Sequence, residues 1–305
     1  MDASQVIQLW FSPSVILLGV CGNVLVLFAA YREKSLRAVP YMFVLNLCIC
    51  HVMVLLIPYL IFVIAFGREK WKFSSAVCKC QAFLAYSLGM EIMATMTLIS
   101  VNRFVRIVQP VKYPFIFTQR STALMIATSW VLSTLGNIFP LIGYGRYGLN
   151  NSGDYMCALQ VSSSVIQITV GGVCVIVAAA IIIICYVGVF CTIRAHNRRV
   201  RPSEPRTLTS QTSFSVAPRE SRGEENQIAI TLFLFVVIFA ICWSPTVVSV
   251  IINAMTGEPT SHLAGIIRVN ALVTETVLDP IVYAIRNKPF RQVLKKTFKK
   301  QPRRS

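Results

Sequence analysis

Residues 13–31, PSVILLGVCGNVLVLFAAY, form an apolar run without a charged side chain. A helix that crosses a bilayer needs about 20 such residues. Six more apolar runs follow, at residues 39–67, 82–101, 122–143, 170–190, 228–252 and 264–285. The chain is 55% hydrophobic and 13% charged, whereas a soluble domain is about a quarter charged. Because lipid offers the backbone no hydrogen-bond partners, each run is expected to be helical, which gives an all-α fold, a seven-transmembrane helix bundle.

Positive charges lie on alternate connections between these runs. The net charge is +17, and 23 of the 29 Lys and Arg residues fall in residues 32–37, 103–120, 194–222 and 286–304. This bias marks the cytoplasmic side, so we expect an extracellular N-terminus, a cytoplasmic C-terminus and no nucleic-acid partner. The expected parts are an extracellular segment at 1–12, a seven-transmembrane domain at 13–285, and a short amphipathic helix with a basic tail at 286–305 that lies on the lipid bilayer.

Three of the ten cysteines, Cys78, Cys80 and Cys157, lie on the expected extracellular side, where disulfides persist. A bridge from Cys78 or Cys80 to Cys157 would join the start of the third run to the loop before the fifth. Asn150 begins a sequon on that loop and is a candidate glycosylation site. The basic connection at 194–224 is rich in Ser, Thr and Pro and is expected to be disordered.

Short motifs occur in a fixed order along the runs. They are Gly22-Asn23, Trp71 seven residues before Cys78, NRF at 102–104, Pro110, Trp130, Tyr186, CWSP at 242–245 and DPIVY at 279–283. Together they resemble the rhodopsin-like (class A) G-protein-coupled receptors over nearly the whole chain. The loop GYGRYGL at 143–149 is similar to the melatonin-receptor and opsin neighbourhood. The resemblance selects Cys78 over Cys80 as the partner of Cys157.

The resemblance also implies a switch at the cytoplasmic end of the bundle. Arg103 is expected to pair with Glu225 in the closed state, and Pro245 is expected to kink the sixth helix so that its cytoplasmic part can swing outward. Asn102 stands where the family has an aspartate, so its bond to Arg103 is weaker and basal signalling is expected. The alternative is that Arg103 only snorkels to the headgroups. The full switch set is Asn102, Arg103, Phe104, Tyr186, Glu225, Trp243, Pro245, Asp279, Pro280 and Tyr283; Arg103 and Val111 are expected to contact the G protein.

A second set of candidates is a buried polar cluster of Asn23, His51, Glu275 and Asp279. His51, Glu91, Glu275 and Asp279 lie within the apolar runs, and ionisable side chains inside membrane helices usually face the bundle interior. Glu275 and Asp279 are one helical turn apart and share a face. His51 stands where the family carries a sodium-binding aspartate, so sodium regulation is expected to be lost or rebuilt. Both a proton-sensitive cluster and a static hydrogen-bonded core stay open, as does the choice of Glu275 or Asp279 as the partner of His51.

The resemblance places a ligand pocket between the third, fifth, sixth and seventh helices. Its expected walls include Tyr86, Met90, Gln167, Trp243, Thr246 and Val273. Ala85 replaces the aspartate with which amine receptors bind their ligands, and Val273 replaces the lysine that holds retinal in opsins. The expected ligand is therefore a small molecule that is neither an amine nor covalently attached retinal.

The sequence thus predicts a plasma-membrane receptor, an orphan with respect to its ligand, that activates a heterotrimeric G protein. The alternative is a non-signalling relative that acts as a scaffold or ligand sink, because several family positions are altered. A transporter would be indicated by inverted repeats, which are not apparent. The sequence shows no set of nucleophile, base and orienting residue and no spacing typical of metal ligands, so no enzyme, cofactor or metal site is expected.

Overall fold

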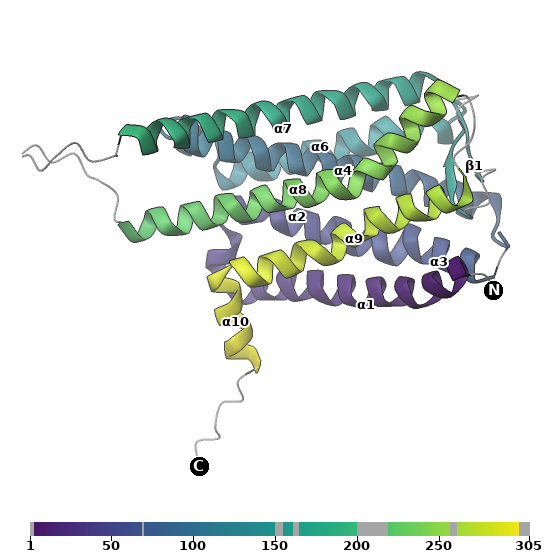
Figure 1. The fold of residues 1–305 in the computed structure, drawn as a ribbon, viewed down its shortest axis with the longest axis horizontal. Coiled ribbons are helices and arrows are strands. Elements are labelled where there is room, and N and C mark those ends of the chain that lie inside the picture. Colours follow the sequence, from purple (N-terminus) through teal and green to yellow (C-terminus); the bar gives the residue numbers. More distant parts are fainter. Residues whose placement is uncertain are drawn as a thin grey trace, which may run out of the picture.

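The structure is a computed structural model, and it describes residues 3–68, 70–149, 155–160, 165–199, 219–256 and 261–298. Within these residues, seven helical spans lie side by side in an elongated bundle (Figure 1). The spans are α1 (Ala3–Arg32), α2 and α3 (Val39–Val54 and Leu60–Gly67), α4 (Ser75–Val108), α6 (Gln119–Ile138), α7 (Val165–Arg199), α8 (Arg219–Thr256) and α9 (His262–Arg286). The predicted seven-helix bundle is confirmed.

The smaller elements lie at the two ends of the bundle. They are α5 (Tyr113–Ile116), β1 (Tyr147–Leu149), β2 (Cys157–Leu159) and α10 (Lys288–Phe298). We call the end with β1 and Cys78 the disulfide end, and the opposite end, with Arg103 and α10, the arginine end. α10 turns away from the bundle there (Figure 1), and Phe290 packs edge-on against Tyr283 with ring centres 5.2 Å apart. The predicted amphipathic helix therefore uses part of its apolar face against the bundle.

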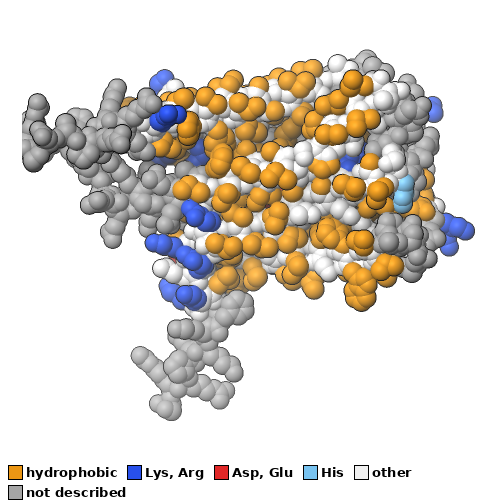
Figure 2. All heavy atoms as spheres, viewed as in Figure 1, with side chains coloured by type: hydrophobic (Ala, Val, Ile, Leu, Met, Phe, Trp, Pro, Cys, Tyr) orange, Lys and Arg blue, Asp and Glu red, His pale blue; other side chains and the backbone are white. Residues whose placement is uncertain are grey.

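Apolar composition explains most of the spans. Among the described helices, six are long and apolar enough to cross a membrane, and α9, which carries Arg268, Glu275 and Asp279, is not among them. On the face that Figure 2 shows, hydrophobic side chains cover the length of the bundle, and Lys and Arg side chains gather mainly toward the arginine end. This distribution fits helices that meet lipid along their length and water at their ends.

Local signals set several helix boundaries. Ser74 and Ser261 begin α4 and α9 by accepting backbone hydrogen bonds from Val77 and Ala264, and Thr118 forms a capping box with Ser121 at the start of α6. Two helices are longer than their apolar runs, since α1 begins at Ala3 and α8 begins at Arg219. Of the connection at 194–224 that was expected to be disordered, both ends are helical, and residues 200–218 lie outside the described residues.

Close helix contacts depend on small residues. A Cβ atom added to Gly22 of α1 would lie 2.9 Å from Cγ of Pro280 in α9, so only glycine permits this approach. The largest buried cluster lies between α1, α2, α4, α8 and α9 and includes Phe43, Leu47, Met96, Phe235 and Tyr283. This packing positions the polar residues described below.

Candidate functional site

A disulfide fixes the end of the bundle at which β1 lies. Cys78 of α4 is bonded to Cys157 of β2, which pairs antiparallel with β1, and Cys80 is a free, exposed cysteine. The bridge expected from the family resemblance is therefore present. Asn150, the candidate glycosylation site, lies outside the described residues.

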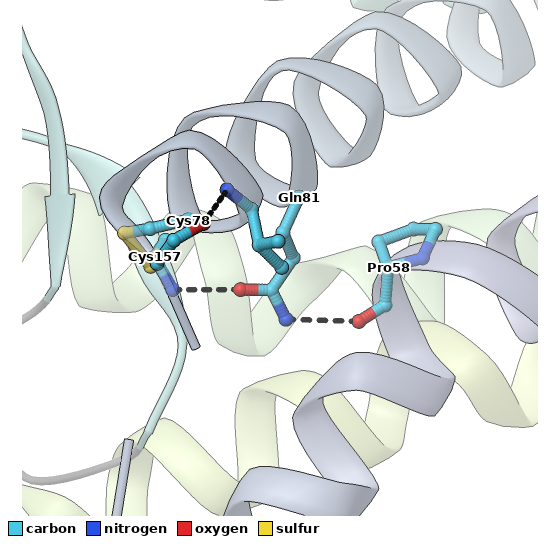
Figure 3. Close-up of a disulfide and its surroundings, with 6 residues drawn as sticks. Pro58, Cys78, Gln81 and Cys157 are labelled. Atoms are coloured by element: carbon cyan, nitrogen blue, oxygen red, sulfur yellow. Dashed lines mark hydrogen bonds between the residues drawn. A yellow bond between two sulfur atoms is a disulfide. The ribbon is translucent and has the colours of Figure 1, made fainter. Parts of the chain in front are cut away.

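Gln81 of α4 joins this disulfide to the π-helical turn between α2 and α3, a link that sequence analysis did not predict. Its Nε2 donates to the Pro58 carbonyl at 2.9 Å, and its Oε1 accepts from the Cys157 N–H at 3.2 Å (Figure 3). Pro58 lies in a π-helical turn, Leu55–Tyr59, where the regular backbone hydrogen bonds are displaced. A fully buried amide thus satisfies two backbone groups from distant segments.

At the arginine end, Arg103 is 4% exposed and turns toward its neighbour. Its Nε donates to Oδ1 of Asn102 at 3.1 Å, and Nη2 donates to the same oxygen. Asn102 in turn donates from Nδ2 to the Tyr113 hydroxyl at 3.3 Å. An aspartate could not make this last donation. The amide therefore links Arg103 to α5, and the Arg106 guanidinium covers the Tyr113 ring at 4.7 Å.

Other expected switch residues line the same end. Phe104 packs so closely on α7 that a Cβ atom on Gly188 would lie 2.6 Å from its ring. The Tyr186 ring meets Phe233 of α8 edge-on, with centres 5.1 Å apart. Val111 is 80% exposed and free of packing contacts that would hide it from a partner. Glu225 lies in α8, but its side chain is outside the described residues, so the pairing with Arg103 stays a prediction.

The expected polar cluster assembles in the middle of the bundle from α1, α2 and α9. Asn23 donates from Nδ2 to the carbonyls of Gly19 and Thr276, both at 2.8 Å. Its Oδ1 lies 3.3 Å from Nδ1 of His51. His51 Nε2 lies 3.9 Å from Oε1 of Glu275, so Glu275 is the acidic neighbour that the sequence left undecided.

The cluster leaves several polar atoms without hydrogen bonds. His51, Glu275 and Asp279 are 0%, 1% and 4% exposed. Among the described residues, His51 Nε2, Glu275 Oε1 and both carboxylate oxygens of Asp279 are buried and have no hydrogen-bond partner. A cavity of about 10 Å³ adjoins His51 and Asp279, and its lining also includes Asn23, Tyr283 and apolar side chains.

Trp243 connects this cluster to α8. Its Nε1 donates to Oε2 of Glu275 at 3.1 Å, and its ring stacks at a tilt on Phe239 with centres 5.1 Å apart. Pro245 follows two residues later, and α8 bends on its way to the disulfide end (Figure 1). Pro280 follows Asp279 in α9, and the buried Tyr283 ring lies edge-on to Tyr41 at 6.2 Å.

The expected ligand-binding residues lie toward the disulfide end. The Tyr86 ring stacks on Tyr147 of β1, 6.0 Å between centres, and its hydroxyl accepts from the Leu159 N–H at 3.4 Å. Val273 is buried, Met90 is half-buried, and the buried Thr246 hydroxyl has no hydrogen-bond partner in the described part of the chain. The side chain of Gln167 is outside the described residues.

A second buried carboxylate, Glu91 of α4, stands apart from the cluster. Asn46 Nδ2, Ser129 Oγ, Ser133 Oγ and Thr95 Oγ1 donate to it at 2.8, 2.9, 3.3 and 3.4 Å. Trp130 Nε1 donates to Oδ1 of Asn46 at 2.8 Å. The sequence placed Glu91 inside the bundle but not in this network, although Ser129 and Ser133 are spaced one helical turn apart.

Comparisons with known proteins agree on one family. The family described as 7 transmembrane receptor (rhodopsin family) matches residues 22–283. The chain is 26% identical to melanopsin-B of Xenopus laevis over 287 residues, 92% of this chain and 52% of the relative. It is 27% identical to melatonin receptor type 1A of Phodopus sungorus, covering 92% of this chain and 77% of that protein.

The fold has a close counterpart among solved structures. Squid rhodopsin superposes with a TM-score of 0.82 at 21% identity, covering 98% of this chain and 81% of that chain. The chain spans about half the length of the melanopsins that it matches, 50–55% in the three compared. The similarity therefore covers the seven helices.

Proposed function

The chain belongs to the rhodopsin family of seven-transmembrane receptors, and on this premise we propose that it senses an extracellular small molecule and activates a heterotrimeric G protein. The observation that carries the proposal is the state of Arg103. A cation that served only as a headgroup anchor would extend outward, whereas Arg103 is 4% exposed and bonded to Asn102. The receptor lies in the plasma membrane with its disulfide end outside, because Lys and Arg concentrate at the arginine end.

Activation proceeds by outward movement of α8 at the arginine end. Pro245 removes a backbone hydrogen bond and provides the hinge. The Trp243–Glu275 bond connects this hinge to α9, so a ligand that displaces Trp243 also disturbs the polar cluster. The opened cleft would present Arg103, and the exposed Val111 would meet the G protein beside it.

The ligand binds toward the disulfide end, near Tyr86, Met90, Gln167, Trp243, Thr246 and Val273. α9 contains no lysine, so the covalent retinal attachment of opsins has no counterpart here. Ala85 offers no charge for an amine. A small neutral or amphipathic molecule fits these walls.

Agonist-free signalling tests the proposal. Arg103→Ala should abolish the signal in cells that express a panel of G proteins, while Arg120→Ala, which changes an exposed arginine at the start of α6, should leave it intact at matched surface expression. If wild type gives no signal with any G protein, or if Arg103→Ala signals like wild type, the receptor mechanism is wrong. The first outcome favours the scaffold or ligand sink.

Asn102→Asp tests the weakened restraint. A carboxylate would pair ionically with Arg103, and a gain of about 1 kcal/mol would lower the active population about fivefold. We expect basal signalling to fall about fivefold while the amount of receptor at the cell surface is unchanged. Equal basal signals from the two proteins would show that the amide imposes no bias.

A further inference from the structure

Three side chains from two helices converge at the unsatisfied cluster. One ligand-type atom each from His51 of α2 and from Glu275 and Asp279 of α9 lies within 4.8 Å of the others, and all three residues are buried. Two ligands about 2.1 Å from one tetrahedral zinc ion are about 3.4 Å apart. The His51–Glu275 pair, at 3.9 Å, is about 0.5 Å wider than this, and the whole set closes onto one ion with movements of about 1 Å or less per atom.

The hydrogen bonds around His51 fix which ring nitrogen faces the carboxylates. Because Asn23 Nδ2 donates to two carbonyls, its Oδ1 is the atom directed at His51. An oxygen acceptor requires that His51 Nδ1 carry the proton. In the neutral ring, Nε2 then presents a lone pair to Glu275 Oε1, which is an acceptor as well. Two acceptors that face each other across 3.9 Å repel unless a proton or a metal ion lies between them.

The same arrangement is typical of the surroundings of a metal ligand. A metal-binding histidine usually donates its second N–H to a neighbouring oxygen, which orients the ring. Glu275 is held in a comparable way, since Oε2 accepts from Trp243 and leaves Oε1 without a partner. A cavity of about 10 Å³, about the size of one water, lies beside His51 and Asp279, although Glu275 does not line it.

Charge and donor type identify the class of ion. Metal ligands bind in their deprotonated forms, in which two carboxylates and a neutral imidazole carry a charge of −2. A divalent cation neutralises this charge and a monovalent ion does not. Imidazole nitrogen favours zinc and its transition-metal neighbours over magnesium or calcium. We infer that His51, Glu275 and Asp279 form a binding site for one divalent cation of the zinc class, which joins α2 to α9.

Metal binding to the whole receptor tests this inference. Purified, chelator-stripped receptor in lipid nanodiscs with sodium chloride present would be dialysed against zinc, magnesium or calcium chloride. We expect about one bound zinc ion per chain, a thermal unfolding midpoint that rises with zinc concentration, and no such effect of magnesium or calcium. The readout is binding alone, so its failure leaves the proposed receptor function untouched.

Three substitutions locate the ion. His51→Gln, Glu275→Gln and Asp279→Asn should each weaken zinc binding by about 100-fold or more, because even partners of metal ligands contribute about 10–100-fold. His262→Gln, at the far end of α9, and Glu91→Gln should bind as wild type does. The unfolding midpoint without metal shows whether each variant is folded.

The inference is overturned by two results. One is a wild-type receptor that binds no zinc under these conditions. The other is zinc binding that does not depend on the cluster. Such binding would survive all three cluster substitutions in folded protein, or would disappear on thiol blocking, since Cys80 and Cys191 are exposed free cysteines.

Discussion

Two groups of buried acids lie within the same bundle, and they differ in how many of their carboxylate oxygens accept hydrogen bonds. Glu91 receives hydrogen bonds from four side chains on α2, α4 and α6. Glu275 and Asp279 lie among α2, α8 and α9, and three of their four carboxylate oxygens have no hydrogen-bond partner in the described part of the chain. Both groups are nearly inaccessible.

The contrast separates a structural polar group from a functional one. A fully hydrogen-bonded network specifies one packing arrangement, whereas unpartnered buried polar atoms cost free energy that folding alone does not recover. Such atoms persist where they bind something or where they hold two conformations close in energy. The Glu91 network therefore holds three helices together, and we propose that the bundle responds at the His51 cluster.

The largest effect should come from removing the satisfied carboxylate. Glu91→Leu keeps a similar volume but leaves the donors of Asn46, Ser129 and Ser133 without their acceptor. We expect a loss of about 2–4 kcal/mol in the free energy of unfolding, at about 0.6–1 kcal/mol per bond. Unfolding of purified receptor in mixed micelles measures it. Glu91→Gln, which retains an acceptor oxygen, is the control and should lose about 1 kcal/mol or less; equal losses from the two variants would contradict the network.

In the His51 cluster, we expect a substitution to raise the free energy of unfolding rather than to lower it. Asp279→Asn removes an ionisable group whose oxygens lack partners. In the presence of chelator, it should raise the free energy of unfolding by about 1–2 kcal/mol, because the cost of burying an unpaired acid is lost. The same unfolding experiment measures the change. A loss comparable to that of Glu91→Leu would mean that Asp279 has partners and would erase the contrast between the two groups.

The sequence predicted the spans and inward-facing acids but not their partners. α9 is more polar than the six helices that are apolar enough to cross a membrane, but the run at 264–285 and its place in the pattern of spans predicted it nonetheless. α1 extends to Ala3, and in this added segment Gln8 bonds to Asn270 in α9, a contact between distant residues that leaves no local pattern. Apolar length predicts where a helix can cross lipid, but pairing of polar residues decides where it ends.

The candidate site shows the same division. Helical spacing placed Glu275 and Asp279 on one face, and both lie at the same cluster. Which of the two acids lies nearer to His51 depends on side-chain rotamers, which spacing does not predict. The adjacency of Asn102 and Arg103 predicted their bond. The link from Asn102 to Tyr113 requires the docking of α5 and could not be read from spacing.

The smallest effect should come from the edge of the Glu91 network. Trp130→Phe keeps the ring on α6 but removes the donor to Asn46 Oδ1, and Asn46 still donates to Glu91 and Thr95. One membrane hydrogen bond contributes about 0.6 kcal/mol, so the loss should be about 0.5–1 kcal/mol.

Combining Trp130→Phe with Glu91→Gln gives a double-mutant cycle, in which a coupling of about 0.5 kcal/mol or more is expected because both substitutions loosen Asn46. The pair Trp130→Phe and Asp279→Asn, which share no partner, should be additive. Coupling in the second pair and additivity in the first would mean that the two acid groups belong to one network, and the division between a structural and a responsive cluster would fail.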